Sequence, residues 1–310
     1  MIITVSLNPA LDKTLVVDGL TVDSVNRVAA TRTDAGGKSI NVAKIVSVLG
    51  GQTLATGIVG GATGQFIQTQ LDQMGIRHDF VLSSAPTRTN LKITDRVRRT
   101  TTELNEAGAP VTEELLEKVW NKLNSVADSG DIVVISGANP PGMGDDVLAR
   151  WICQLKQKGV FVALDTVGAA MRLGIEARPD VIKPNLSELS DLFGEQLHYL
   201  RDVIAAARHI VQQGVGHVIV SMGGDGALFA TRDRILRCPG LKITLGSTVG
   251  SGDAMLAAVL HSMQEGRSLE ETARWAIAAG SANAMCDGSQ TPTAELIREL
   301  YEKTEVYSMN

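Results

Sequence analysis

The fold class is decided by Asp131-Ile-Val-Val-Ile-Ser136 and the two segments that follow it. These are residues 145–158 and the run Val160-Phe-Val-Ala-Leu164. Both short runs are rich in β-branched residues, whereas the segment between them carries apolar residues at the spacing of one helix face. A strand, a helix and a second strand in this order are typical of parallel strands joined by a helical crossover. We therefore expect an α/β fold.

The same alternation extends over most of the 310 residues. We expect strands at Ile2–Leu7, Asp131–Ser136, Val160–Leu164, Val181–Lys183, His217–Ser221 and Ala227–Ala230, and helices at Glu113–Ala127, Asp145–Lys158 and Leu200–Gln213. Right-handed crossovers place helices on both faces of such a sheet and ligand-binding loops at the carboxyl ends of its strands. The pattern predicts a three-layer α/β/α fold with a mostly parallel central sheet.

Two stretches depart from this rhythm, residues 11–33 and 88–105, and alternate with a period closer to two. We interpret them as strands of a small additional β-sheet that acts as a lid beside the binding edge, where it would exclude water from a transfer reaction. No repeat, low-complexity segment or linker interrupts the chain. Residues 1–310 are therefore expected to form one domain with a small lid.

Composition excludes several classes of protein. Hydrophobic residues make up 44% and charged residues 20%, which is ordinary for a globular chain. The net charge of −5 argues against a nucleic-acid partner, and no apolar run approaches the ~20 residues needed to span a membrane. Three widely separated cysteines and the lack of a signal-peptide pattern favour a cytoplasmic protein with reduced thiols.

The glycine-rich segment Ser247-Thr-Val-Gly-Ser-Gly-Asp253 runs into an alanine-rich helix. Small residues before a helix expose backbone N–H groups at its positive end, and Gly250, Ser251 and Gly252 are expected to form an anion hole. Asp253 would lie at the mouth of that hole, where its carboxylate can accept a proton from an attacking hydroxyl. The alternative is that Asp253 only caps the helix.

Two other nucleotide-binding motifs fail on spacing. Asp34-Ala-Gly-Gly-Lys-Ser39 ends like a Walker A loop, but that motif requires a glycine where Arg32 stands. A nicotinamide-binding oxidoreductase would need Gly-x-Gly-x-x-Gly after the first strand, where Asn8-Pro9 stands instead. The segment before Asp253 thus remains the main candidate for a phosphate site.

Seven segments occur together in one order: Asn8-Pro-Ala-Leu-Asp12, Asp34-Ala-Gly-Gly-Lys-Ser-Ile-Asn41, Thr87-Arg-Thr-Asn90, Ser136-Gly-Ala-Asn-Pro-Pro-Gly142, Lys183-Pro-Asn-Leu-Ser-Glu188, Ser221-Met-Gly-Gly-Asp-Gly-Ala227 and the Asp253 segment. In this order they resemble the ribokinase-like (PfkB) carbohydrate kinases almost from end to end. The resemblance implies a ribokinase-like fold, ATP as phosphoryl donor, Mg²⁺ as cofactor and Asp253 as catalytic base.

The resemblance also implies where the acceptor binds. The sugar contacts are expected at Asp12, Gly36, Gly37, Asn41, Asn90 and Ser136. For Asp12, an Asx-turn after Asn-Pro-Ala is the alternative. Lys38 and Arg88 are expected to hold a phosphate already present on the acceptor, because guanidinium and ammonium groups suit a phosphomonoester. Solvated surface charge is the alternative for both, and Arg96, Arg98 and Arg99 could share the role.

By the same resemblance, the nucleotide is expected at Lys183, Asn185, Ser221, Gly223, Gly226, Thr248 and Asn283, with magnesium organised by Asn185 and Glu188. One amide and one carboxylate suffice for an ion that keeps several waters. Each assignment has a structural alternative: a helix capping box for Asn185 and Glu188, a hairpin turn for the glycine-rich loop, and an ordinary helix position for Asn283.

Two residues depart from the family pattern, in which Gly is common at position 39 and Ala at position 251. Ser251 is small and keeps its N–H group, so the anion hole should survive. Ser39 would either tighten the sugar site or add a hydrogen bond.

Thr87-Arg-Thr-Asn-Leu-Lys92 and Thr102-Glu-Leu-Asn-Glu106 look most like the branch that converts fructose 1-phosphate to fructose 1,6-bisphosphate. Tagatose 6-phosphate is the alternative acceptor, since the kinases that use it share almost every motif. A catalytically weak, sugar-phosphate-binding regulator on a kinase fold is the alternative of a different class. The expected partners are these small molecules and ATP, together with a second copy of the chain if two lids pack as a homodimer.

Overall fold

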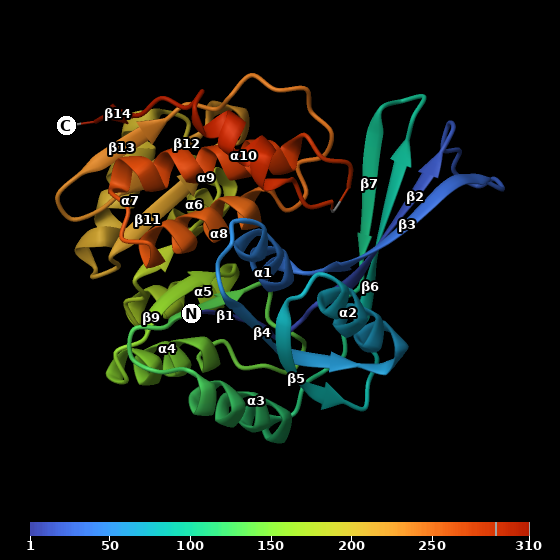
Figure 1. Cartoon of the computed structure of the whole chain (residues 1–310), viewed down its shortest axis with the longest axis horizontal. Helices are drawn as coiled ribbons and strands as arrows, with labels where there is room; N and C mark the ends of the chain where they lie inside the picture. The colour runs from blue at the N-terminus through green and yellow to red at the C-terminus, as the bar shows by residue number, and fades with distance from the viewer. Residues whose placement is uncertain (289, 310) are drawn as a thin grey trace.

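The computed structural model describes residues 1–288 and 290–309, which form a large central sheet, helices on both of its faces and a smaller sheet (Figure 1). Seven strands of the central sheet are parallel, in the order β5 (Arg77–Ser83), β4 (Thr53–Gly60), β1 (Ile2–Ser6), β8 (Ile132–Ser136), β9 (Phe161–Asp165), β10 (Val181–Ile182) and β11 (His217–Ser221). The antiparallel strands β12 (Ala227–Ala230), β13 (Ile235–Cys238) and β14 (Tyr307–Ser308) continue it beyond β11.

Alternate side chains of the central strands enter separate hydrophobic cores. Ile3 and Val133 face one core together with α3 (Glu113–Val126), α4 (Val147–Gln157), α5 (Gly168–Glu176), α6 (Leu186–Phe193) and α7 (Leu200–Gln212). Ile2 and Val134 face the other, with α1 (Lys38–Val48), α8 (Ser251–Gln264), α9 (Leu269–Ala284) and α10 (Ala294–Tyr301). A third core joins α1 to α2 (Gly61–Gln73) beside β4. The strands read as continuous apolar runs because both faces are covered.

The smaller sheet has the order β3 (Val28–Gly36), β2 (Ala10–Val17), β6 (Arg88–Asp95) and β7 (Thr100–Asn105). Figure 1 shows it projecting away from the helices and the central sheet. The outer strand β7 is exposed along its whole length. The base of the sheet adjoins the main body, because β3 ends at Gly36 immediately before α1 begins at Lys38.

The predicted α/β/α fold with a mostly parallel sheet and a second, smaller sheet is confirmed. The predicted strands at 217–221 and 227–230 are reproduced, and the other predicted strands and helices shift by one or two residues. Strand β9 ends at Asp165 rather than at Leu164, which matters for the site below. Strand β2 begins at Ala10 and β3 ends at Gly36, so the small sheet reaches beyond residues 11–33. The assignment of the chain to one domain stays a prediction.

No helix within the described residues is both long and apolar enough to cross a membrane.

Candidate active site

Asp253 lies in the first turn of α8, at the carboxyl edge of the central sheet, and is 7% exposed. Gly250 is the N-cap, with a φ of 77°, and the Asp253 side chain does not cap the helix. Instead, Asn41 of α1 donates a hydrogen bond of 2.8 Å to Asp253 Oδ2. The helix-cap alternative is therefore wrong, and the carboxylate is held from a separate element.

Burial raises the pKa of Asp253 to about 6, and repulsion from the Asp165 carboxylate adds to the increase. The Asn41 hydrogen bond and the charges of Lys38 and Lys183 limit the rise in this pKa. A carboxylate with a pKa near 6 is ionised at neutral pH, yet it is more basic than an exposed aspartate. These are the properties that general-base catalysis requires.

Asp165 is a site residue that the sequence did not reveal. It is fully buried at the end of β9, where Lys38 Nζ lies 2.9 Å from Oδ1 and Lys183 Nζ lies 3.6 Å from Oδ2. Burial raises the pKa of Asp165, but Lys183 and Lys38 outweigh that effect and hold the pKa below its ordinary value. The signal was an aspartate at the carboxyl end of an apolar strand, just beyond the predicted boundary.

The loop before α8 forms a turn of small residues, as expected. Ser251 N–H donates to Thr248 O at 3.2 Å. Of the three N–H groups expected to form the anion hole, this one is therefore bonded within the turn. A Cβ at Gly252 would lie 3.1 Å from Lys183 Nζ, which places a buried ammonium group directly against the turn. The turn therefore combines the positive end of α8 with a lysine side chain.

Asn283 supports this turn from beneath. Its amide donates to Val249 O at 2.7 Å and lies 3.4 Å from Ser251 Oγ. The sequence prediction put Asn283 beside the adenine, whereas the structure places its side chain against the loop that leads into α8. This contact gives Asn283 a positioning role, and its place near the adenine stays a prediction.

The expected acceptor contacts gather at the base of the small sheet. Asp12 is buried within β2, so the Asx-turn alternative is wrong. Asn90 donates to Asp12 Oδ1 at 3.0 Å, and the buried Lys92 donates to Oδ2 at 2.7 Å. Gly36 lies against the same carboxylate, because a Cβ there would be 2.4 Å from Asp12 Cγ. Asp12, Gly36 and Asn90 are thus brought together, with Lys92 as an additional buried cation.

Gly37 and Ser39 fix the start of α1 against the sheet. Gly37 is its N-cap with a φ of 103°, a region that side chains disfavour. Ser39 Oγ lies 2.5 Å from Val5 O and 2.8 Å from Ser136 O, and it accepts from Ser136 N–H at 3.1 Å. Ser39 therefore adds hydrogen bonds that join α1 to two central strands, and the question left by the sequence is answered.

Ser136, the last residue of β8, is also buried at this edge of the central sheet, and its hydroxyl lies 3.4 Å from Asp165 Oδ2.

The two cations expected to hold the acceptor phosphate have other partners. Lys38 lies 3.7 Å from Glu188 Oε1 as well as beside Asp165, so it sits among the carboxylates around Asp253. Arg88 donates through Nη1 to Glu106 O at 2.7 Å, and through Nε and Nη2 to Asn8 O at 3.3 and 3.1 Å. A shared phosphate clamp made by these two side chains stays a prediction.

A cavity of about 400 Å³ opens beside the turn, between the β11–β12 hairpin and the helices α8 and α9. It is lined by Asn185, Ser221, Gly223, Gly226 and Thr248 of the predicted nucleotide residues, together with Ser251 and Gly252 of the turn. The hairpin interpretation of the glycine-rich loop is also correct, since residues 223–225 form a single 3₁₀ turn between antiparallel strands.

Asn185 and Glu188 form a capping box at the start of α6. Glu188 N–H donates to Asn185 Oδ1 and Asn185 N–H donates to Glu188 Oε2, both at 2.8 Å. Glu188 Oε1 lies outside the box and faces Lys38. Within the described part of the chain, no cluster of three His, Cys, Asp or Glu side chains is placed to hold a metal. This donor set fits an ion bound by one carboxylate oxygen and mostly by water.

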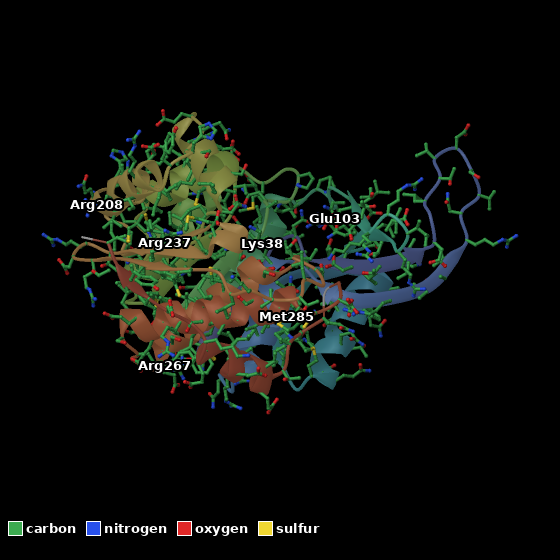
Figure 2. The ribbon with its side chains drawn as sticks, turned by 90° about the horizontal axis from the view of Figure 1, so that it is seen from above. Lys38, Glu103, Arg208, Arg237, Arg267 and Met285 are labelled. Carbon is green, nitrogen blue, oxygen red and sulfur yellow. The ribbon has the colours of Figure 1, made fainter. Side chains whose placement is uncertain are left out.

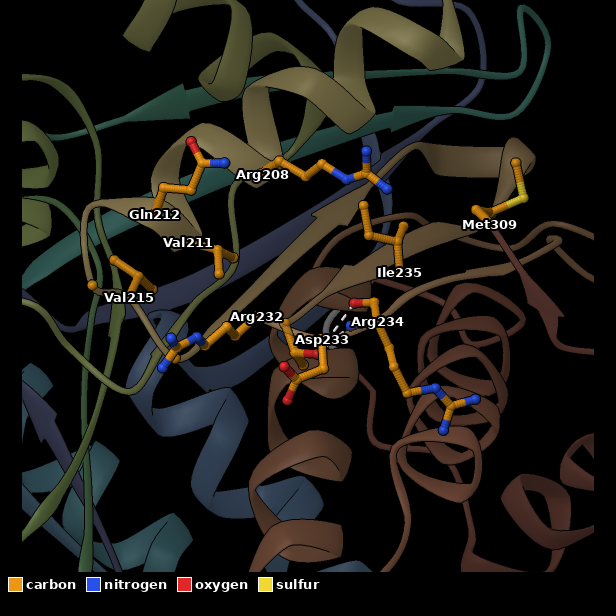
Figure 3. A pocket seen from close by; sticks show the side chains of 12 residues that line it. Arg208, Val211, Gln212, Val215, Arg232, Asp233, Arg234, Ile235 and Met309 are labelled. Atoms are coloured by element: carbon orange, nitrogen blue, oxygen red, sulfur yellow. Dashed lines mark hydrogen bonds between the residues drawn. The ribbon is translucent and has the colours of Figure 1, made fainter.

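A larger cavity, of about 780 Å³, lies far from these residues and is shown in Figure 3. Figure 2 shows Arg208, one of its lining residues, at the end of the molecule opposite Glu103 of the small sheet, with Lys38 between them. Arg208, Arg232 and Asp233 are exposed, and in Figure 3 the two guanidinium groups point in different directions. Volume alone therefore does not identify the active site.

Comparison with known proteins assigns the family. A profile of the pfkB family carbohydrate kinases matches residues 6–296. A 1-phosphofructokinase of Rhodobacter capsulatus is 39% identical over 279 residues, 89% of this chain and 88% of the relative. A 1-phosphofructokinase of Bacillus subtilis is 32% identical over 306 residues, 99% of each chain.

Similar solved structures support the same family assignment. Phosphofructokinase-2 from Escherichia coli in complex with potassium has a TM-score of 0.93 at 30% identity, covering 97% of this chain and 98% of that one. Ribokinase from Thermotoga maritima has a TM-score of 0.78 at 22% identity, covering 97% and 99%, and shares the fold. With a family profile spanning most of the sequence and relatives matched almost from end to end, the chain belongs to the pfkB family of carbohydrate kinases.

Proposed function

We propose that this kinase transfers the γ-phosphoryl group of ATP to the primary hydroxyl of fructose 1-phosphate, which yields fructose 1,6-bisphosphate. One observation carries the proposal: Asp253 lies between two sites. Its partner Asn41 follows the Gly36–Gly37 turn at the acceptor face, and its neighbour Gly252 lines the 400 Å³ cavity. A hydroxyl and a nucleotide can therefore meet at one carboxylate.

In this mechanism Asp253 accepts the proton of the attacking hydroxyl. Its raised pKa gives the carboxylate the basicity for this transfer, and the ionised form dominates at neutral pH. The Asn41 amide occupies Oδ2 and orients the carboxylate, which leaves Oδ1 for the hydroxyl. Proximity and orientation of this kind contribute a large part of catalysis in phosphoryl transfer.

The cations of the site would stabilise charge on the transferred group. Lys183 lies against Gly252 and contacts Oδ2 of Asp165. Lys38 contacts the other oxygen of the same carboxylate, Oδ1. The backbone N–H groups of Gly250 and Gly252 would complete the anion hole, while Ser251 N–H holds the turn. Magnesium would be held through Glu188 Oε1 and water, near Asn185, and would neutralise phosphate charge when bound.

The relatives support the choice of acceptor. The Rhodobacter and Bacillus proteins are named 1-phosphofructokinase, and both match nearly the whole chain. Phosphofructokinase-2 from Escherichia coli has been solved in complex with fructose-6-phosphate, and the TM-score of that complex to this chain is 0.92. Fructose 6-phosphate is therefore the second candidate acceptor. Tagatose 6-phosphate stays the alternative from sequence.

A coupled assay of ADP release across fructose 1-phosphate, fructose 6-phosphate, tagatose 6-phosphate and fructose would test the proposal. We expect the highest kcat/KM with fructose 1-phosphate. A higher value with either 6-phosphate would replace the acceptor and leave the kinase assignment intact. Thermal stabilisation by a sugar phosphate without turnover of ATP would instead favour the regulator.

We also propose that the chain forms a homodimer through the small sheet. Several large apolar side chains of this sheet and its loops are exposed: Val22, Val25, Val28, Val97 and Leu104. A tetrameric form of Escherichia coli phosphofructokinase-2 has been solved, so oligomers occur in this fold. Light scattering after size exclusion should give twice the mass of one chain, and Leu104→Asp should reduce it. A cytoplasmic location stays a prediction.

A further inference from the structure

Lys44 is a buried lysine to which the proposed reaction assigns no role. It lies on α1, three residues after Asn41, and is 5% exposed. Its ammonium group donates to the carbonyl oxygen of Ala35, near the end of β3. Strand β3 is at the edge of the small sheet, so one side of its backbone has no neighbouring strand. Lys44 therefore ties α1 back to the strand that precedes it.

This hydrogen bond holds the chain at the turn that leads into α1. Gly36 and Gly37 follow Ala35 directly, and the turn meets the acceptor face on its other side. A Cβ at Gly36 would lie 2.4 Å from Asp12 Cγ, so the backbone here touches the carboxylate that is expected to bind the sugar. A displacement of Ala35 would move Gly36 relative to Asp12. The side chain of Lys44 thus fixes the turn from inside the protein.

An ammonium group at this position is costly. Its hydrogen bond goes to a neutral carbonyl, and burial lowers the pKa of Lys44 to about 8. The carboxylates of Asp34 on β3 and Asp12 on β2 oppose this decrease in pKa. The charges of Lys92 on β6 and Arg32 on β3 add to it. Because a buried charge is unfavourable unless other groups compensate it, packing alone would favour an apolar side chain here.

We propose that Lys44 is a positioning residue for the acceptor. It holds the turn from Ala35 to Gly37 at the distance from Asp12 that the sugar hydroxyls require, and it does not touch the substrate itself. The role rests on the proposed phosphosugar kinase activity, because it concerns how the acceptor of that reaction is bound.

The charge on Lys44 makes this role depend on pH. Charge-assisted hydrogen bonds are about twice as strong as neutral ones, so an uncharged amine holds Ala35 less firmly. With a pKa of about 8, Lys44 is charged at neutral pH and loses its proton as the pH rises through that value. Acceptor binding should therefore weaken on the alkaline side, whereas ATP binding in the 400 Å³ cavity should not.

The test measures KM for the phosphosugar with the highest kcat/KM in the wild type, Lys44→Met and Lys44→Arg. Lys44→Met keeps an unbranched side chain and removes both the donor and the charge. We expect it to raise the acceptor KM by about 10-fold at neutral pH, the lower end of the range for a charge-assisted hydrogen bond. The kcat and the KM for ATP should be nearly unchanged. Lys44→Arg keeps a charged donor and should retain most of the acceptor affinity.

The pH profile separates positioning from a merely structural role. In the wild type, the acceptor KM should rise above pH 8. In Lys44→Met it should be high and without this rise. In Lys44→Arg it should stay low to about pH 9, because arginine keeps its charge. A flat wild-type profile, or an alkaline rise that persists in either variant, would overturn the role of Lys44.

Val46→Ala is the matched control. Val46 is fully buried on the same helix, but it packs in the core that α1 shares with α8. Its truncation should lower the melting temperature without changing the acceptor KM. An unchanged acceptor KM in Lys44→Met, or an equal rise in Val46→Ala, would contradict the proposal. If Lys44→Met does not fold, the pH profiles of the wild type and Lys44→Arg decide.

If the wild type phosphorylates none of the phosphosugars, the proposed function fails separately. Calorimetry of fructose 1-phosphate binding then decides the role of Lys44. Binding that is weaker in Lys44→Met than in the wild type and Val46→Ala supports it, whereas equal binding or none overturns it.

Discussion

Two groups of charged residues, one around Asp253 and one at the larger cavity beside α7, are organised in opposite ways. Around Asp253, the side chains of Asp165, Lys183 and Asp253 itself are buried and Lys38 is half-buried, and they come from β9, the segment after β10, α8 and α1. In the larger cavity beside α7, Arg208, Arg232 and Asp233 are exposed and extend from one helix and one hairpin (Figure 3).

The difference lies in the cost of burial. A buried charge is unfavourable unless other groups compensate it, so a cluster of buried charges persists only where the fold holds each partner in place. Exposed arginines are solvated and carry no such requirement. Convergence of buried charges therefore marks the active site better than cavity size does.

The largest effect is expected for Asp253→Asn, which keeps the shape of the side chain and removes the base. We expect kcat to fall by at least ~100-fold, with the KM values for ATP and acceptor nearly unchanged. Asp233→Asn in the larger cavity is the matched control and should retain wild-type turnover. Near-normal kcat in Asp253→Asn would refute the role of Asp253 and remove the contrast between the two cavities.

The same variant should also gain stability at high pH. An unfolded aspartate loses its proton near pH 4, and the folded Asp253 loses it near 6, so the folded state binds more protons in this window. The contribution of Asp253 to stability is therefore greatest below pH 4 and is lost as the pH rises through about 6. Asp253→Asn should melt above the wild type at pH 8, and the difference should shrink towards pH 4.

Asp165→Asn tests whether the buried cluster depends on its central carboxylate. The substitution leaves Lys38 and Lys183 facing a neutral amide, and breaking a buried ion pair costs about 3–5 kcal/mol. Urea denaturation should show a loss of this size. A loss below 0.5 kcal/mol would mean that the cluster is as well solvated as the exposed arginines.

Ser39→Gly introduces the residue that is common at this position in the family. It removes the hydroxyl that lies between Val5 O and the backbone of Ser136, and leaves buried backbone groups without a partner. We expect a loss of about 1–3 kcal/mol in the free energy of unfolding. Ser39→Ala is the control for the added backbone freedom of glycine, and an unchanged value in both variants would contradict this role.

The pH dependence of kcat should report the Asp253 pKa. Turnover should fall as the pH drops below about 6, where the carboxylate becomes protonated. The Asn41 hydrogen bond lowers this pKa, so Asn41→Ala should move the acid limb to higher pH. An unmoved acid limb would assign it to another group.

The smallest effect is expected for the double substitution Arg208→Gln with Arg232→Gln. Both side chains are exposed in the larger cavity, so turnover and both KM values should stay within twofold of the wild type. A larger change would show that the two cavities are coupled.

The sequence was sufficient for the fold class and for the elements with strong periodicity, such as α7 and β11. The resemblance to the family also implied that Asp12 and Asn41 lie near the acceptor and Asp253, and the structure shows Asn41 bonded to Asp253. The sequence did not reveal Asp165, since a single aspartate after an apolar run looks like a turn residue. The buried Lys92 was also missed. The register of β2 and β6 decides which side chain faces Asp12, and this register cannot be determined from the sequence alone.

Lys44 shows the same limit. Helical spacing puts it on α1, but only the packing shows that its ammonium group donates to Ala35 O in the interior. Burial lowers the pKa of Lys44 to about 8, while the carboxylates of Asp34 and Asp12 oppose that decrease. No local pattern distinguishes this lysine from a solvated one.

Helix α1 connects the two halves of the reaction through a single rigid element. Gly36 touches Asp12 just before the helix, and Asn41 holds Asp253 one turn into it, about 5.4 Å along the axis. This part of the chain acts as a spacer of fixed length between the sugar and the base. An acceptor whose hydroxyl stands one carbon nearer or farther would meet the carboxylate out of line. Regioselectivity would then follow from the geometry of one helical turn.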